Sequence, residues 1–378
     1  MSLSQNPKSE DQSPKTEDPS PKPEDLTLDA YDFELPEELI AQRPAERRDR
    51  SRLLVLDRAT GALADRTFAD LPDLLAPGDL LVVNDARVIP ARLAGAREPG
   101  GGRAELFLVE RIEEEAEAAV WDVLARPGRR LREGARVRFD GGLVAEVLEV
   151  RPDGRRRVRF TAGEGAPVRE DVGALMARVG RVPLPHYIRG GEGDDEDRVR
   201  YQTVFARAEG SVAAPTAGLH FTPELLAALD ARGVERATVT LHVGYGTFEP
   251  VKAENLRDHA VAPERIEVPE ETAAAIAAAR ARGGRIVAVG TTTTRALESA
   301  AGADGVVRAW AGETGLTVTP GYRFRVVDAL VTNFHLPRSS LLVLVASFAG
   351  RAATLAAYRY AVAGGYRFYS YGDAMLVA

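Results

Sequence analysis

The chain of 378 residues contains no cysteine. It therefore has no disulfide, no thiol nucleophile, and no iron–sulfur cluster or zinc bound by cysteine. It has no run of about 18 apolar residues, so no membrane span is expected, and its first residues lack the apolar core of a secretory signal. None of the five histidines stands in a metal-binding spacing, so we expect no metal. These absences favour a cytoplasmic protein.

Lysine is also scarce, because Lys252 is the only lysine after residue 25. Almost all positive charge is arginine, and the formal net charge is −7, which argues mildly against a nucleic-acid-binding protein. The first 25 residues repeat the pentapeptides PKSED, PKTED and PKPED and contain almost no hydrophobic side chains. This composition predicts a disordered tail over residues 1–25 without a catalytic role.

The length favours two domains, and the pattern of elements changes twice along the chain. Residues 86–170 contain six short runs of alternating hydrophobicity, separated by turns rich in Gly and Pro, which predict a small β-barrel. In residues 26–85 and 171–378, strands alternate with helices, which is typical of a mainly parallel sheet. The predicted fold is an α/β catalytic domain into which the barrel is inserted.

The segment VGTTTTRALES, residues 289–299, follows an expected buried strand. Loops at such strand ends form the ligand-binding edge of α/β sheets. Free N–H groups at a helix start bind anions, threonine hydroxyls add donors, and Arg295 adds a planar fork for a carboxylate or phosphate. An exposed arginine behind a simple helix cap is the alternative interpretation, although four threonines exceed what a cap needs.

Histidines occur in three further segments that are irregular or lie at the end of an expected strand. His242 precedes Gly244 in LHVGYGTFEP, where a turn with a core histidine is the favoured interpretation on these residues alone. The segment ALVTNFHLPRSSLL places His335 between an apolar strand and a helix. The segment GSVAAPTAGLHFTPELL is small and uncharged, and it carries His220 to the start of a helix; an internal packing loop is the alternative. Several histidines at one edge favour acid–base chemistry.

The motifs that carry a family resemblance extend from about Tyr31 to Val377. They are YDFELPEELIAQRP, LLVVNDARVIPARL, VPLPHYI, RYQTVFA, GSVAAPTAGLHFT, HVGYGTF, VGTTTTRALES, PGYRFRVVDALVTNFHLPRSSLL and YRFYSYGDAMLV. With these motifs, the chain resembles the S-adenosylmethionine:tRNA ribosyltransferase-isomerase family of queuosine biosynthesis. The combination is very specific, because no single short pattern carries it.

The resemblance implies both a reaction and an architecture. A 7-aminomethyl-7-deazaguanine base in the tRNA anticodon receives the ribosyl part of S-adenosylmethionine, adenine and methionine leave, and epoxyqueuosine forms. S-adenosylmethionine is then a consumed substrate and no metal is needed. The implied enzyme is cytoplasmic and monomeric, and it has an α/β domain with an inserted β-barrel.

The resemblance and this chemistry together imply roles for motif positions. The catalytic candidates are His220, His242, His335 and Asp373. The candidates for binding S-adenosylmethionine are Thr216, Thr291, Thr292, Thr293, Arg295 and Asn333. The candidates for binding the acceptor are Asn84, Arg87, Gly244, Glu264 and Tyr371. Which histidine acts as base and which as acid remains open at this point.

Some positions depart from the family pattern. Ala262 and Pro263 stand before Glu264 where the family usually has His and Ser, and Tyr245 stands where a smaller apolar residue is usual. Two alternatives therefore stay open. The chain could be a paralogue that uses the same chemistry on another amine or on a free deazaguanine, or it could be a non-catalytic RNA-binding protein that reads RNA with its barrel.

Overall fold

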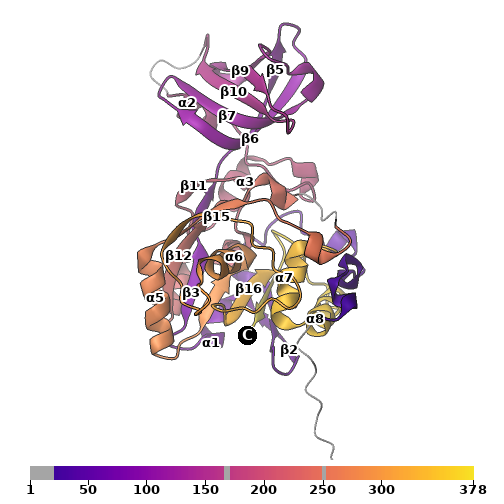
Figure 1. The fold of residues 1–378 in the computed structure, drawn as a ribbon, viewed down its shortest axis with the longest axis vertical. Helices are drawn as coiled ribbons and strands as arrows, with labels where there is room; N and C mark the ends of the chain where they lie inside the picture. Colours follow the sequence, from indigo (N-terminus) through magenta and orange to yellow (C-terminus); the bar gives the residue numbers. More distant parts are fainter. Residues whose placement is uncertain (1–20, 166–170, 249–252) are drawn as a thin grey trace, which may run out of the picture.

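The computed structural model describes residues 21–165, 171–248 and 253–378. A β-barrel stands above a larger α/β domain, and the C-terminus lies in the larger domain (Figure 1). The sequence predictions for residues 1–20, 166–170 and 249–252 lie outside the described residues. The expected α/β class with an inserted barrel is confirmed.

The larger domain is built on a nine-stranded sheet in the order β15-β13-β12-β3-β14-β16-β17-β1-β2. Its strands are β1 (Arg52–Leu56), β2 (Leu63–Thr67), β3 (Leu80–Asn84), β12 (Glu235–Leu241), β13 (Glu264–Val268), β14 (Ile286–Val289), β15 (Trp310–Thr314), β16 (Ala329–Asn333) and β17 (Ala374–Val377). The central strands β12, β3, β14 and β16 pair in parallel, as do β17 and β1. The strands β13 and β15 add antiparallel at one edge, β2 adds antiparallel at the other, and β17 lies antiparallel to β16. The sheet is therefore mixed, with a parallel centre.

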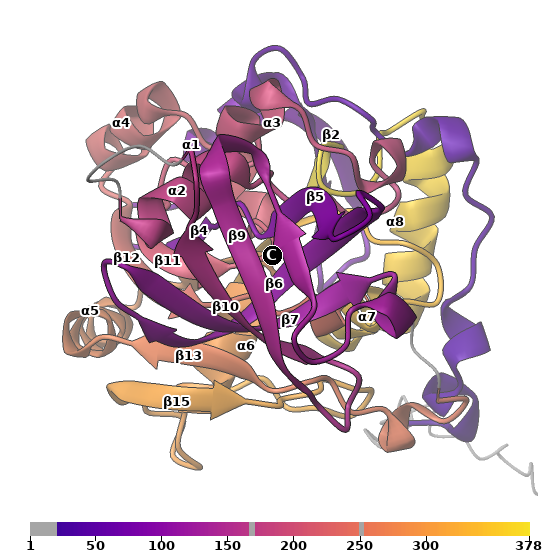
Figure 2. The ribbon, with the colours of Figure 1, turned by 90° about the horizontal axis from the view of Figure 1, so that it is seen from above.

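Helices cover both faces of this sheet, which is why β14 is apolar throughout and β3 is apolar up to its last residue, Asn84. On β3, Leu80 and Val82 belong to the core on one face, whereas Leu81 and Val83 belong to the core on the other. The first face is covered by α5 (Glu270–Ala281), α6 (Gly290–Ala300), α7 (Ser340–Ala349) and α8 (Arg351–Ala363). The second face is covered by α1 (Leu71–Leu74), α4 (Pro223–Ala231) and the 3-10 helix η9 (Thr216–His220). Figure 2 shows both sets of helices from above.

The barrel is closed and has a core of its own, which includes Leu106, Val123 and Phe160. Its strands are β5 (Arg92–Glu98), β6 (Arg103–Glu114), β7 (Ala118–Arg126), β8 (Arg136–Arg138), β9 (Leu143–Val150) and β10 (Arg156–Ala162). The helix α2 (Val172–Val179) packs on β7, β9 and β10. The strand β4 (Ala86–Val88) lies outside the barrel and pairs with β11 (Ala208–Ser211).

Two chain segments connect the domains side by side. The chain enters the barrel at Arg92 and leaves it near Arg181, and these two residues exchange backbone hydrogen bonds of 3.1 and 2.8 Å. The short helix α3 (Asp195–Arg200) follows the return crossing. The barrel and the larger domain are therefore joined by a paired, two-stranded neck.

The start of the ordered chain differs in detail from the sequence interpretation. Residues 21–25 were assigned to the tail, yet the 3-10 helix η1 (Pro23–Leu26) contacts α8, where Asp25 forms an ion pair with Arg351 at 2.7 Å. The Tyr31 hydroxyl donates to the Asp25 carbonyl at 2.9 Å. Within the described part of the chain, no single helix has the length and apolarity of a membrane span; only α7 and α8 taken together do, and a 116° bend separates them.

Candidate functional site

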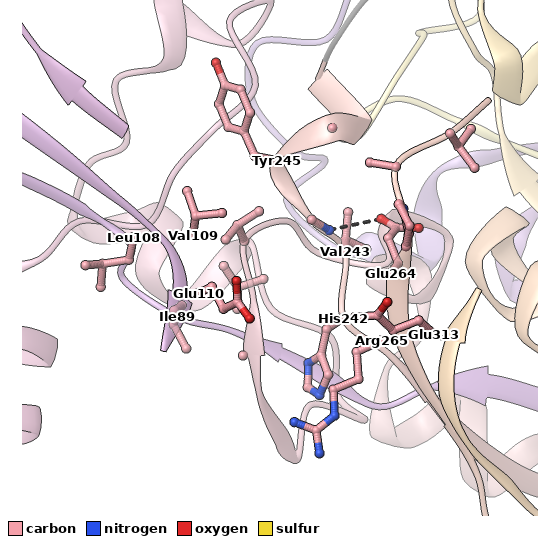
Figure 3. Close-up of a pocket in the computed structure, with 18 of the residues that line it drawn as sticks. Ile89, Leu108, Val109, Glu110, His242, Val243, Tyr245, Glu264, Arg265 and Glu313 are labelled. Carbon is pink, nitrogen blue, oxygen red and sulfur yellow. Dashed lines mark hydrogen bonds between the residues drawn. The ribbon is translucent and has the colours of Figure 1, made fainter. Parts of the chain in front are cut away.

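A cleft of about 1440 Å³ lies between the barrel and the carboxyl edge of the sheet. The parallel strands β12, β3, β14 and β16 all end at this edge, so the segments that follow them meet there. Figure 3 shows the part of the cleft where barrel residues such as Leu108 face Val243 and Glu264 of the larger domain. The cleft is therefore built by both domains.

Arg295 lines the cleft about one turn into α6. Its Nε donates to the Leu316 carbonyl at 2.9 Å, and its Nη1 pairs with the Glu264 carboxylate. The other Glu264 oxygen accepts from the Gly244 N–H at 3.0 Å. The Arg295 side chain is only 9% exposed, and its Nη2 has no hydrogen-bond partner within the described residues. One donor of a buried guanidinium is thus left for a ligand.

Two histidines, His242 and His259, also line the cleft. Burial lowers the pKa of both, and the Arg265 guanidinium lowers that of His242 further. Both rings are therefore neutral near pH 7 and can accept a proton. His242 Nδ1 and His259 Nε2 have no partner in the part of the chain that the structure describes.

Side chains at the β12–β13 edge point in opposite directions. His242 points the same way as Arg265, whereas Glu264, one residue earlier on β13, points away from them (Figure 3). This opposition follows from the alternation of side chains along a strand. The Leu316–Thr317 segment links His259 to the Arg295 side, because the Thr317 hydroxyl accepts from the Val261 N–H at 3.2 Å and Leu316 accepts from Arg295.

The model of the family described as queuosine biosynthesis protein matches residues 28–377. The chain belongs to this family. It is 56% identical over 351 residues to an S-adenosylmethionine:tRNA ribosyltransferase-isomerase of Gloeobacter violaceus, a match that covers 92% of this chain and 95% of the relative. It is also 56% identical over 352 residues to the protein of that name from Anaeromyxobacter dehalogenans, covering 93% and 99%. The crystal structure of S-adenosylmethionine tRNA ribosyltransferase from Thermotoga maritima is similar, with a TM-score of 0.52 and 40% identity over 92% of this chain and 100% of that one.

Five of the residues selected from the sequence line the cleft of this family member. They are Arg87, His242, Gly244, Glu264 and Arg295. Arg87 is half exposed and lies 3.7 Å from the Glu209 carboxylate. The other selected residues are not among those that line the cleft. Their predicted roles stay predictions, and the contacts below show what holds each of them.

The four threonines of α6 are not among the residues that line the cleft, and two of them bond their own helix. The Thr293 and Thr294 hydroxyls donate to the carbonyls of Val289 and Gly290, at 2.8 and 3.1 Å. Such bonds to the residue four positions earlier are the usual choice of a threonine inside a helix. Thr291 and Thr293 are buried, and the buried Thr292 hydroxyl has no partner among the described residues. Of the predicted anion site, only Arg295 reaches the cleft.

His220 and Asn333 form a separate buried cluster. Their Nε2 and Nδ2 atoms lie 3.1 Å apart, and the His220 ring stacks on Phe68 with centroids 4.9 Å apart. Burial, followed by the charge of Arg48, holds the pKa of His220 well below its usual value. Arg48 itself is buried and donates to the Leu219 carbonyl at 2.9 Å. In this arrangement His220 is a neutral group packed inside the protein.

His335 and Asp373 are bound by neighbouring groups inside the larger domain. His335 Nε2 lies 3.0 Å from the Thr332 hydroxyl, and burial lowers its pKa to about 3. The Asp373 carboxylate accepts from the backbone N–H groups of Arg52 and Arg367, at 3.0 and 2.8 Å. The carboxylate thus ties the start of β1 to the turn before β17.

Tyr371, Asn84 and Thr216 also have structural surroundings. The Tyr371 hydroxyl donates to Asp197 at 2.6 Å. The Asn84 amide donates to the Leu241 carbonyl at 2.9 Å, and its oxygen accepts from the N–H groups of Ala86 and Leu241. Asn84 therefore links the ends of β3 and β12. Thr216 opens η9 and is partly buried.

Two residues of the cleft escaped the sequence interpretation. His259 was not selected, although it lies five residues before the selected Glu264. Trp121 lies within a strand of the barrel, where an aromatic residue is typical of a core. Asp85 supports the site from behind; it is buried and accepts from the Thr240 hydroxyl at 2.6 Å and from Arg207 at 2.8 Å. Its position directly after Asn84, at a strand end, was a usable signal.

Proposed function

We propose that this chain transfers the ribosyl part of S-adenosylmethionine to 7-aminomethyl-7-deazaguanine in a tRNA anticodon and isomerises it. The products are epoxyqueuosine in the tRNA, adenine and methionine. The observation that carries the proposal is the buried Arg295 with one unpaired donor in a cleft between the two domains. Family membership and relatives that bear the enzyme's name over nearly their whole length support it.

The residues of the cleft fit S-adenosylmethionine. Its methionine carboxylate matches the free Nη2 of Arg295, because hydrogen bonds between guanidinium and carboxylate are among the strongest in proteins. When bound, its sulfonium makes the neighbouring CH₂ group acidic and makes methionine a good leaving group. Glu264 keeps Arg295 in place through Nη1 and is itself held by the Gly244 N–H. The carboxylate of the substrate therefore meets a donor that is already oriented.

Proton abstraction falls to His259 in this proposal. Its neutral ring is available as a base, and it shares the Leu316–Thr317 segment with Arg295. His242 points the same way as Arg265 and is also neutral. We assign to its ring N–H the hydrogen bond to the nitrogen of the leaving adenine, which takes up a proton as the glycosidic bond breaks. A positioned acid or base of this kind contributes about 10²–10⁴-fold to a rate.

The acceptor in this proposal is the base within tRNA. We propose a cytoplasmic enzyme, because tRNA is modified in that compartment, and we propose that it is a monomer. A second candidate is supported by Ala262, which lines the cleft beside Pro263 and Glu264 without a polar side-chain group. Because Ala262 and Pro263 offer no polar side-chain group to an acceptor, another amine or a free deazaguanine is the alternative acceptor.

The deciding experiment measures adenine released from S-adenosylmethionine in the presence of three acceptors. These are tRNA carrying the aminomethyl base, the same tRNA with unmodified guanine, and the free aminomethyl base. Release that depends on modified tRNA is expected. Release with the free base alone would establish the second candidate, and tRNA binding without any release would make the chain a non-catalytic RNA-binding protein.

A further inference from the structure

The wall of the cleft at and beside the barrel has an apolar floor that is buried or partly buried. Its residues are Ile89, Leu108, Trp121, Leu124, Met176 and Val212. Leu108 and Val212 are almost completely buried. Charged barrel residues stand further out, since Glu110 and Arg111 have side chains 63% and 56% exposed. The deep part of this wall is therefore apolar, while its rim is charged.

Within this floor, Trp121 carries a polar atom that no described residue satisfies. Its indole Nε1 is buried and has no hydrogen-bond partner among the described residues. Indole nitrogen is a donor only, so its missing partner must be an acceptor. Buried donors without a partner are uncommon in native proteins, and an aromatic ring of this kind is usually found with its N–H bonded. The cleft is where such an acceptor can arrive.

An aromatic contact also crosses the domain boundary, and one of its rings, that of Tyr245, lines the cleft. The rings of Phe107, on β6, and Tyr245, on the 3-10 helix η10 (Tyr245–Phe248), meet edge to face with centroids 5.3 Å apart. Figure 3 shows Tyr245 reaching out from the larger domain beside the barrel strand that carries Leu108 and Val109. A flat ring bound against Trp121 would thus have aromatic and aliphatic neighbours contributed by both domains.

We propose that Trp121 and its apolar neighbours form a subsite for a nucleobase, in which Nε1 donates to a ring nitrogen or carbonyl oxygen of a purine-like heterocycle. The subsite complements the charged side of the cleft, where Arg295 and Glu264 lie. The inference rests on the proposed function, which supplies two such heterocycles: adenine from S-adenosylmethionine, and the deazaguanine of the tRNA. Their shared chemistry is an aromatic face with an acceptor at its edge.

The composition of the chain makes a direct binding experiment possible. Trp121 and Trp310 are the only tryptophans, and Trp310 does not line the cleft. In a Trp310→Phe background, Trp121 is the sole tryptophan fluorophore. Titrating this protein with adenine and with free 7-aminomethyl-7-deazaguanine should give saturable quenching with at least one of them. The two titrations identify which source of the heterocycle occupies the subsite.

The matched variant is Trp121→Phe, which keeps an aromatic ring and removes the donor. Calorimetry should show an affinity about threefold to tenfold weaker for S-adenosylmethionine if adenine occupies the subsite, or for modified tRNA if deazaguanine does. Trp310→Phe should bind both substrates like the wild type, and thermal melts establish that both variants are folded. A threefold to tenfold loss of affinity for one substrate only is the supporting result.

Absence of quenching by either heterocycle, or wild-type affinity of Trp121→Phe for both substrates, would overturn the subsite. These outcomes leave the proposed function standing if the wild-type protein still releases adenine with modified tRNA. Failure of the wild type to release adenine would instead remove the proposed function. Quenching by either free heterocycle would even then support the subsite.

Discussion

Replacing Arg295 tests the placement of S-adenosylmethionine in the cleft. The guanidinium has three tasks: Nε bonds the Leu316 carbonyl, Nη1 bonds Glu264, and Nη2 is left for the substrate carboxylate. Lysine keeps the charge but offers one compact ammonium group, which cannot reproduce this planar fork. Both Arg295→Lys and Arg295→Ala should therefore weaken binding of S-adenosylmethionine.

The size of the effect follows from the single bond that the substrate makes. A hydrogen bond between charged groups contributes about 1.5–3 kcal/mol, so Arg295→Ala should lose about tenfold to a hundredfold in affinity. The fold also responds, because Glu264 is only 5% exposed and loses an ion-pair partner. Breaking a buried pair in this way costs about 3–5 kcal/mol of unfolding free energy. Arg295→Lys should keep more of the stability than of the affinity.

The assay is isothermal calorimetry with S-adenosylmethionine in the absence of tRNA, at a temperature well below each variant's Tm. Binding of tRNA alone is measured in parallel and should change little. The reasoning is refuted if Arg295→Ala binds S-adenosylmethionine normally and loses tRNA. Arg295 would then be a phosphate contact, and the substrate carboxylate would lie elsewhere in the cleft.

Three further predictions follow from the cleft, the core and the tail. His259→Gln and His242→Gln should each lower single-turnover adenine release by about 10²-fold or more while leaving the Kd for S-adenosylmethionine unchanged; a normal rate for either variant would remove that histidine from the mechanism. Burial lowers the pKa of His335 to about 3, whereas an unfolded histidine titrates near 6.5, so the unfolded state binds the extra proton. His335 should therefore reduce the free energy of unfolding by about 1.4 kcal/mol per pH unit as the pH falls from about 6.5 toward 3; urea melts of His335→Gln should show a shallower acid slope than melts of the wild type, and equal slopes would refute this role of His335. Deleting residues 1–20 should leave turnover and Tm unchanged. Deleting residues 1–25 should lower Tm by about 1–2 °C, because the Asp25–Arg351 contact is lost. Equal melting temperatures of the two deletion variants would contradict the structural role given to η1.

Most of the architecture could be predicted because it depends on local patterns. The barrel strands are short, alternate in polarity and are separated by turns that contain Gly and Pro, so β5 to β10 fall inside the interval 86–170. The apolar runs of β3, before Asn84, and of β14 indicated a sheet covered on both faces. The antiparallel edges were not apparent, since the direction in which β13 pairs with β12 depends on tertiary packing and not on its own sequence.

The candidate site was harder to predict because chemistry-bearing residue types also serve as structural groups. His220, Asn333 and the α6 threonines follow strands at the carboxyl edge of the sheet. Even so, His220 and Asn333 contact each other, and Thr293 and Thr294 bond carbonyls of their own helix. No sequence pattern separates a threonine that binds an anion from one that bonds the carbonyl four residues earlier. Arg295 could be recognised, because one turn into a helix is where a long side chain reaches back past the N-terminus.

The two domains have separate hydrophobic cores, and this determines how the cleft can respond to a ligand. The core of the barrel and the cores of the larger domain share no residue, and the paired neck at Arg92 and Arg181 joins the two parts. Across the cleft, the Phe107–Tyr245 contact is the aromatic pair that touches both sides within the described residues. A ligand that bonds Arg295 on one wall and Trp121 on the other therefore adds contacts between the two domains. Binding energy gained from both walls would favour one relative position of the domains, which places the reacting groups without any change inside either core.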